Sequence, residues 1–130
     1  MSHLVHTAFQ PKVLTLFGNY VRHAREARLQ ADRRYSLRQV AQRIGVEPAY
    51  LSKVERGEVA PPGEETICRL ADDLGENRDV LLALGGKVSS DLREIIRARP
   101  KLFAELLREL KAAPDDALLR IVRQVKDGEW

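Results

Sequence analysis

The segment from residue 36 to residue 57, SLRQVAQRIGVEPAYLSKVERG, leaves the chain few ways to fold. It contains two short stretches with apolar residues at helical intervals, and Gly45 follows the first of them. Helices joined by so tight a turn must cross steeply, which requires a small residue such as Ala41 where they nearly touch. Gly45 tolerates the positive φ angle of the turn. We therefore expect helices at residues 37–44 and 48–56, in contact through Val40, Ile44, Val46, Leu51 and Val54.

Helical periodicity covers most of the remaining sequence, and no stretch has the alternating pattern of a β-strand. Further helices are expected at residues 14–29, 64–74, 78–84, 90–99, 100–112 and 115–126. Residues 1–12 lack a period and contain Pro11, which predicts a loose arm, and the polar residues 30–34 predict a loop. Gly85-Gly86 marks a domain boundary. The predicted fold class is all-α, with an arm at 1–12, a five-helix domain at 13–85 and about three helices at 86–130.

The composition is that of an ordinary globular chain, because 44% of the 130 residues are hydrophobic and 32% are charged. A single cysteine, Cys68, rules out an internal disulfide framework. No apolar run is long enough to cross a bilayer, and the N-terminus lacks the pattern of an export signal. We therefore expect a cytoplasmic protein.

The net charge of +3 is unevenly distributed along the chain. Residues 1–62 carry ten basic and five acidic side chains, a net charge of +5, whereas the remainder carries twelve basic and fourteen acidic ones, or −2. A basic segment rich in arginine is typical of a surface that binds a polyanion, because the planar guanidinium group suits phosphate. The charge alone is equally compatible with a solvated basic face.

Three stretches, SLRQVAQRIGV, AYLSKVERG and PGEETICRLA, resemble the XRE/Cro-type, lambda-repressor-like helix–turn–helix family. The resemblance covers about residues 16–84 and implies a compact five-helix bundle that binds operator DNA, usually as a two-fold dimer. Residues 48–56 correspond to the recognition helix of the family. The chain departs from the family at Leu37, where glutamine is frequent, and in the loop before Ser36, which is longer than usual.

In the geometry that the resemblance implies, the first turn of the recognition helix enters the major groove. Ala49 and Tyr50 can then contact a thymine methyl group, and Lys53 can donate to O6 or N7 of guanine. An alternative for Tyr50 is an exposed aromatic ring packed on the second helix. The predicted base-contacting residues are Pro48, Ala49, Tyr50, Ser52 and Lys53.

Phosphate contacts are predicted on both sides of the recognition helix. Ser36 and Arg38 lie at the start of helix 37–44, where free backbone N–H groups favour an anion. Arg56 resembles a second phosphate contact of the family, and Arg33 and Arg34 can reach the flanking DNA backbone.

Arg25 and Glu55 correspond to a family pair that is partly buried and fixes the first helix against the recognition helix. The resemblance therefore implies a structural ion pair between these two residues and not a DNA contact. Arg43, at the far end of helix 37–44, is expected to be a solvated charge.

The helices after Gly86 have apolar stripes too wide for elements surrounded by water. A two-fold DNA-binding protein needs a contact that holds its recognition helices about 34 Å apart. We therefore hypothesise that residues 87–130 mediate homodimerisation, and the alternative is that they complete the core of the monomer. The candidate dimer residues are Leu102, Phe103, Leu106, Leu107, Leu110, Leu118, Ile121, Val122 and Val125.

These patterns predict a sequence-specific transcriptional regulator, a repressor, that binds a palindromic operator in double-stranded DNA as a homodimer. One alternative is an antitoxin-like or co-regulator module whose C-terminal helices bind a protein, and another is an interaction domain that binds no DNA. No residue set supports an enzyme, and no cofactor or metal is expected. His3 and His6 make a poor metal site in an arm, and Cys68 is better explained as a packed thiol than as a redox switch.

Overall fold

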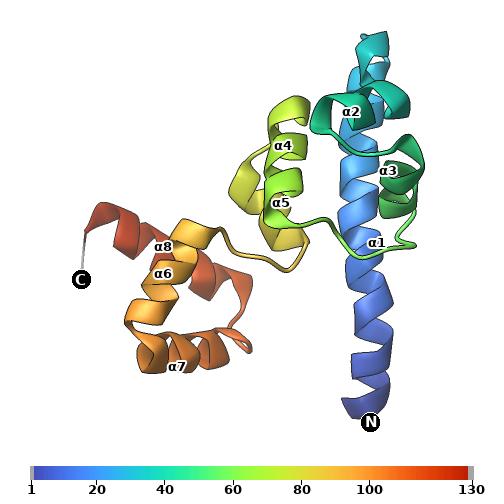
Figure 1. Ribbon diagram of the computed structural model, residues 1–130. Helices are drawn as coiled ribbons and strands as arrows, with labels where there is room; N and C mark the ends of the chain where they lie inside the picture. Colours follow the sequence, from blue (N-terminus) through green and yellow to red (C-terminus); the bar gives the residue numbers. More distant parts are fainter. Residues whose placement is uncertain (1, 129–130) are drawn as a thin grey trace. The chain divides into compact units, whose positions relative to one another are not determined.

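The computed structural model describes the backbone of residues 2–128 and the side chains of residues 16–128 (Figure 1). Within that range the chain is all-α and contains no strand, as the periodicity predicted. It divides into two compact units, one ending at Ser89 and the other beginning at Ser90. The helices are α1 (Ser2–Leu29), the short 3-10 helix η1 (Arg33–Tyr35), α2 (Leu37–Ile44), α3 (Pro48–Glu55), α4 (Glu64–Leu74), α5 (Arg78–Leu84), α6 (Ser90–Ala98), α7 (Pro100–Leu110) and α8 (Asp115–Asp127).

The N-terminal segment differs from the sequence-based expectation. The predicted loose arm is wrong for residues 2–12, because α1 runs without interruption from Ser2 to Leu29. A proline in a helix interior removes one hydrogen-bond donor, so Pro11 weakens the helix at this point but does not end it. The loop predicted at residues 30–34 is also partly helical, because η1 begins at Arg33, where the Asp32 side chain accepts a hydrogen bond from the Arg34 backbone N–H.

A single apolar core holds the first unit together, and its buried members all lie between residues 17 and 82. Helices α2 and α3 contact each other, α3 also contacts α1, and α4 and α5 close the bundle on another side (Figure 1). The fully or almost fully buried residues are Phe17, Val21, Val40, Ala41, Ile44, Leu51, Val54, Ile67, Leu70, Ala71, Leu74, Leu81 and Leu82. Each large side chain buried in this way stabilises the fold by about 1.5–3 kcal/mol.

The contact between α1 and α3 depends on Gly18. A Cβ atom at this position would lie 2.6 Å from the backbone oxygen of Glu55 and closer still to that of Val54. Such distances are far inside van der Waals contact, so only glycine lets α3 approach α1 this closely. Gly18 therefore fixes how deeply α3 is seated in the unit.

The second unit contains α6, α7 and α8, and none of its residues between 90 and 128 is buried. Its helices are amphipathic, yet their apolar residues are largely exposed, with Leu102 at 64% and Val125 at 61% of full exposure. A unit of this size without a buried core is not stable by itself. Its apolar faces therefore require further cover.

None of the described helices combines the length and the apolar character that a membrane-spanning helix requires.

Candidate nucleic-acid interface

The segment between α2 and α3 is a tight turn centred on Gly45. Gly45 adopts a φ of 78°, and the next backbone N–H, of Val46, donates to the carbonyl oxygen of Ala41 at 2.9 Å. Ala41 is completely buried where the two helices meet. At the other end of α2, the Ser36 hydroxyl accepts a hydrogen bond from the Gln39 backbone N–H at 3.3 Å. The left-handed Gly45 and the buried Ala41 agree with the tight turn and the close contact that the sequence predicted.

Helix α3 turns one face to the core and the other to solvent. Leu51 and Val54 are each 1% exposed, whereas Ala49 and Lys53 are exposed. Tyr50 is partly buried and packs against the core, so only part of its ring is accessible. The inner face of α3 is therefore packed against the core, and its outer face is accessible.

The other two predicted base-contacting residues, Pro48 and Ser52, are not both free. Pro48 is half-buried in the first turn of α3, where its missing N–H costs no hydrogen bond. Ser52 is half-buried, and its hydroxyl accepts a hydrogen bond from Nη1 of Arg56 one turn later. The Ser52 hydroxyl therefore already has a partner in the DNA-free protein.

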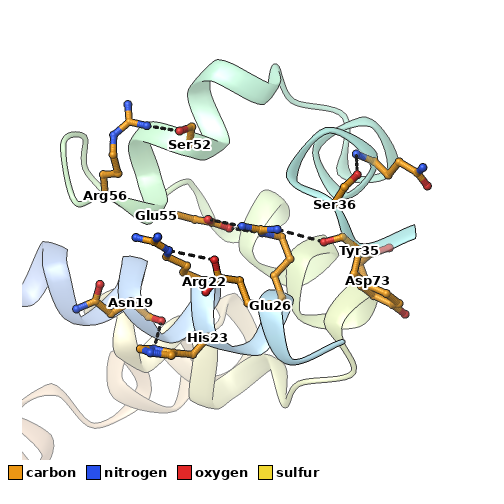
Figure 2. A network of polar contacts seen from close by, with 12 residues as sticks. Asn19, Arg22, His23, Glu26, Tyr35, Ser36, Ser52, Glu55, Arg56 and Asp73 are labelled. Carbon is orange, nitrogen blue, oxygen red and sulfur yellow. Dashed lines mark hydrogen bonds and ion pairs between the residues drawn. The ribbon is translucent and has the colours of Figure 1, made fainter. Parts of the chain in front are cut away.

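A buried ion pair attaches α3 to α1 (Figure 2). Arg25 Nε donates to Glu55 Oε2 at 2.7 Å, and Arg25 Nη2 donates to Glu55 Oε1 at 3.0 Å. Arg25 Nη1 donates to the backbone oxygen of Tyr35 at 3.2 Å, so the guanidinium also holds the segment before α2. The pKa of Arg25 is raised above its ordinary value by its hydrogen bonds to Glu55, although burial acts against this. The pair connects three elements around α3.

The basic residues predicted to contact phosphate fall into two groups. Arg33 and Arg38 are exposed and form no ion pair with any described side chain. Arg34 and Arg56 also reach solvent, but each holds an acidic neighbour, Asp32 and Glu58 respectively. Neither acid was among the residues predicted from the sequence, although each lies two residues from its arginine.

A small cleft connects the start of α2 with the end of α3. It has a volume of about 190 Å³, and its lining includes Leu37, Ser52, Arg56 and Arg22. Arg22 comes from α1 and reaches Glu26 on the same helix at 3.4 Å. The start of α2 and the phosphate candidate Arg56 are thus neighbours in space.

Arg43 differs from its prediction as a solvated charge. Its Nε donates to Asp73 Oδ1 at 2.6 Å and its Nη2 to Asp73 Oδ2 at 3.0 Å, which bridges α2 and α4. The guanidinium also lies over the ring of Tyr35, 5.1 Å from its centroid, in a cation–π contact. Arg43 therefore links two helices of the bundle, while its side chain remains 37% exposed.

The remaining titratable candidates support no second kind of site. His23 Nδ1 lies 2.8 Å from the backbone oxygen of Asn19, one turn earlier on α1, within hydrogen-bonding distance (Figure 2). Cys68 packs against the core. The side chains of His3 and His6 lie outside the described residues. Among the described residues, no three His, Cys, Asp or Glu side chains come together as a metal site would require.

Two short helices that cross at a glycine turn, the second with a free outer face, define a helix–turn–helix domain. Comparison with known families agrees, because the family described as helix-turn-helix domain matches residues 16–84. The chain belongs to this DNA-binding family, which covers more than half of its length. No curated protein matches the sequence, and no solved structure matches it.

Proposed function

We propose that the protein is an XRE/Cro-type transcriptional regulator that binds specific sequences in double-stranded DNA. The observation that carries this proposal is the outer face of α3, which presents Ala49 and Lys53 to solvent. Leu51 and Val54 are buried on the inner face and hold the helix against the core. A helix of this diameter fits the major groove of B-form DNA.

Lys53 is the principal base-contacting residue in this proposal. It is exposed and forms no ion pair with any described side chain, so it can donate to O6 or N7 of guanine. Ala49 and the accessible part of Tyr50 supply apolar contacts to a thymine methyl group, while Pro48 and Ser52 border the same face. These contacts carry sequence information because each base pair shows a different pattern in the major groove.

The backbone contacts come from residues around α2 and after α3. Arg33 and Arg38 have guanidinium groups without an ion-pair partner among the described side chains, and the first N–H groups of α2 beyond Ser36 attract an anion. Arg34 and Arg56 add two further positive charges beside them. Phosphate contacts of this kind fix the position of a protein on DNA and make its affinity depend on salt.

The proposed active species is a homodimer held together by residues 87–130. The apolar residues of α6, α7 and α8 are exposed and need cover, and a second copy provides an identical apolar face. Residues 90–130 carry nine basic and eight acidic side chains, so two copies do not repel one another strongly. A dimer bound to its operator occupies DNA that the transcription machinery needs, which is why we propose repression.

Selection of DNA by the purified protein from a random pool tests this proposal. The expected result is a palindrome whose half-sites lie about one helical turn apart. Replacement of Lys53 with alanine is expected to relax the preference at one position of each half-site. Recovery of no preferred sequence, with binding independent of salt, would contradict the proposal.

A second candidate function uses the same exposed helices differently. An antitoxin-like or co-regulator module would cover the apolar faces of α6–α8 with another protein and not with its own copy. The mass of the purified chain in solution separates the two candidates. A dimer at micromolar concentration supports homodimerisation, and a monomer that binds DNA only together with a second protein supports the alternative.

A further inference from the structure

Two of the arginines predicted to contact phosphate, Arg34 and Arg56, are held by carboxylates in the DNA-free protein. Arg56 Nε donates to Glu58 Oε2 at 2.5 Å, and its Nη2 donates to Oε1 at 3.3 Å. Arg34 Nε donates to Asp32 Oδ1 at 3.0 Å, and its Nη2 donates to Oδ2 at 2.7 Å. In both pairs the same edge of the guanidinium, Nε and Nη2, faces two oxygen atoms.

A DNA phosphate binds arginine in the same way as these carboxylates do. Both groups present two negatively charged oxygen atoms, and both match the fork of donors on a guanidinium group. A phosphate can therefore bind the Nε–Nη2 edge of Arg34 or Arg56 only after it has displaced Asp32 or Glu58. Arg33 and Arg38 face no such competition, because neither is paired with a described side chain.

We propose that Asp32 and Glu58 are internal phosphate mimics, which compete with the DNA backbone for Arg34 and Arg56 and so limit the affinity of the protein for DNA of any sequence. The inference rests on the proposed DNA-binding function. It assigns a role to two acids that lie within a segment carrying ten basic residues.

Both pairs reach solvent, although the Asp32 side chain is only 28% exposed beside Arg34 at 77%. The side chains of Arg56 and Glu58 are 47% and 52% exposed, and solvent weakens an ion pair between groups as accessible as these. A phosphate can therefore displace either acid at a small cost, and this cost lowers the affinity for every DNA sequence.

The test measures binding of the full-length protein to a fluorescein-labelled duplex of mixed sequence by anisotropy. Phosphate contacts do not depend on sequence, so the operator is not needed. Glu58→Gln and Asp32→Asn each remove one charge, and the amide introduced by Asp32→Asn keeps an oxygen that can accept the hydrogen bond from the Arg34 backbone N–H. Each variant is expected to bind about two- to fivefold more tightly than the wild type.

The salt dependence shows whether an arginine has been released. Between about 50 and 200 mM salt, the slope of log K against log salt concentration is expected to steepen by about 0.9 for each new phosphate contact. The gain of Glu58→Gln must also disappear when Arg56 is replaced with alanine. A gain that persists in the Arg56→Ala background would reflect general charge repulsion and would overturn the inference.

Asp72→Asn is the matched control. Asp72 holds Arg78 through the same edge, at 2.8 Å from Nε and 2.5 Å from Nη2, with similar exposure, on helices without predicted DNA contacts. The affinity of the Asp72→Asn variant for DNA and its salt slope are expected to equal those of the wild type. If the wild type binds DNA but neither Glu58→Gln nor Asp32→Asn binds it more tightly than Asp72→Asn, the inference is wrong. The proposed function is not affected by that result. If the wild type shows no binding, the proposed function fails and the inference fails with it.

Discussion

Individual ion pairs serve different purposes according to their burial. Arg25 and Glu55 are 6% and 4% exposed, so neither charge can regain its hydration without opening the contact between α1 and α3. A buried charge that loses its partner destabilises a protein far more than an exposed one. The pairs of Arg34 and Arg56 lie at the surface and contribute little to folding.

Glu55→Ala is expected to lower the melting temperature strongly, because it leaves the Arg25 guanidinium desolvated and without its main acceptor. The expected loss is about 3–5 kcal/mol of unfolding free energy. Thermal denaturation followed by circular dichroism measures it. Lys53→Ala is the control, since Lys53 is exposed on the same helix and its loss should weaken DNA binding only. Equal melting curves for the two variants would contradict the structural role of the pair.

Asp32 is expected to titrate at unusually low pH. Its hydrogen bonds with the Arg34 side chain lower the pKa of its carboxyl group from 3.8 to about 2. A lowered pKa in the folded state stabilises the protein above pH 3.8, and this contribution disappears as the pH falls through about 2. Carboxyl-carbon chemical shifts measured by NMR follow the titration. In Arg34→Ala the pKa should return toward 3.8, and an unchanged pKa would mean that Arg34 is not its cause.

At the scale of elements, glycines determine how α3 is held. Gly45 supplies the left-handed residue between α2 and α3, and Gly18 supplies the close approach of α1 to α3. The two positions together set the direction and the depth of the recognition helix. A change at either one is therefore expected to alter DNA binding as well as stability.

Gly18→Ala is expected to destabilise the first unit by about 1–3 kcal/mol, because the new methyl group meets backbone oxygens that cannot rotate away. It should also weaken DNA binding by displacing α3. Gly63→Ala is the control, since no atom lies within 4 Å of a Cβ at that position. Urea denaturation and anisotropy measure the two effects. A Gly18→Ala variant as stable as Gly63→Ala would show that α1 and α3 separate without cost.

At the scale of the whole molecule, burial is confined to the first unit. The core lies between residues 17 and 82, whereas no residue from 90 to 128 is buried. The first unit therefore has an apolar core of its own. In the proposed homodimer those helices gain a core through association, so their stability should depend on protein concentration.

A fragment ending at Ser89 is accordingly expected to keep the melting temperature of the first unit but to sediment as a monomer. Sedimentation equilibrium compares it with the full chain, which should be a dimer. Leu102→Asp should dissociate the full chain by placing a charge on the apolar face, whereas Val80→Asp, at a similarly exposed position of α5, should not. A monomeric wild type at micromolar concentration would contradict the homodimer.

The sequence by itself determined the helices that bury an apolar stripe and the turn between α2 and α3. Three helices have the bounds that were predicted for them: α2 at 37–44, α4 at 64–74 and α5 at 78–84. They could be predicted because periodicity reports which face of a helix is buried. The pattern of Ala41 and Gly45 likewise predicted the crossing, since a steep contact excludes larger residues.

Only the tertiary structure decided where polar side chains find their partners. Arg43 reaches Asp73 in a distant part of the sequence, and Gly18 faces the backbone of α3, because separate segments are brought together by the bundle. Asp32 and Glu58 were missed for another reason: a separation of two residues allows a contact only in certain backbone conformations. Apolar burial can be predicted from local periodicity, whereas a hydrogen bond or ion pair depends on the positions of both groups in space. This is the physical reason why the sequence predicted the helices but not the partners of their polar side chains.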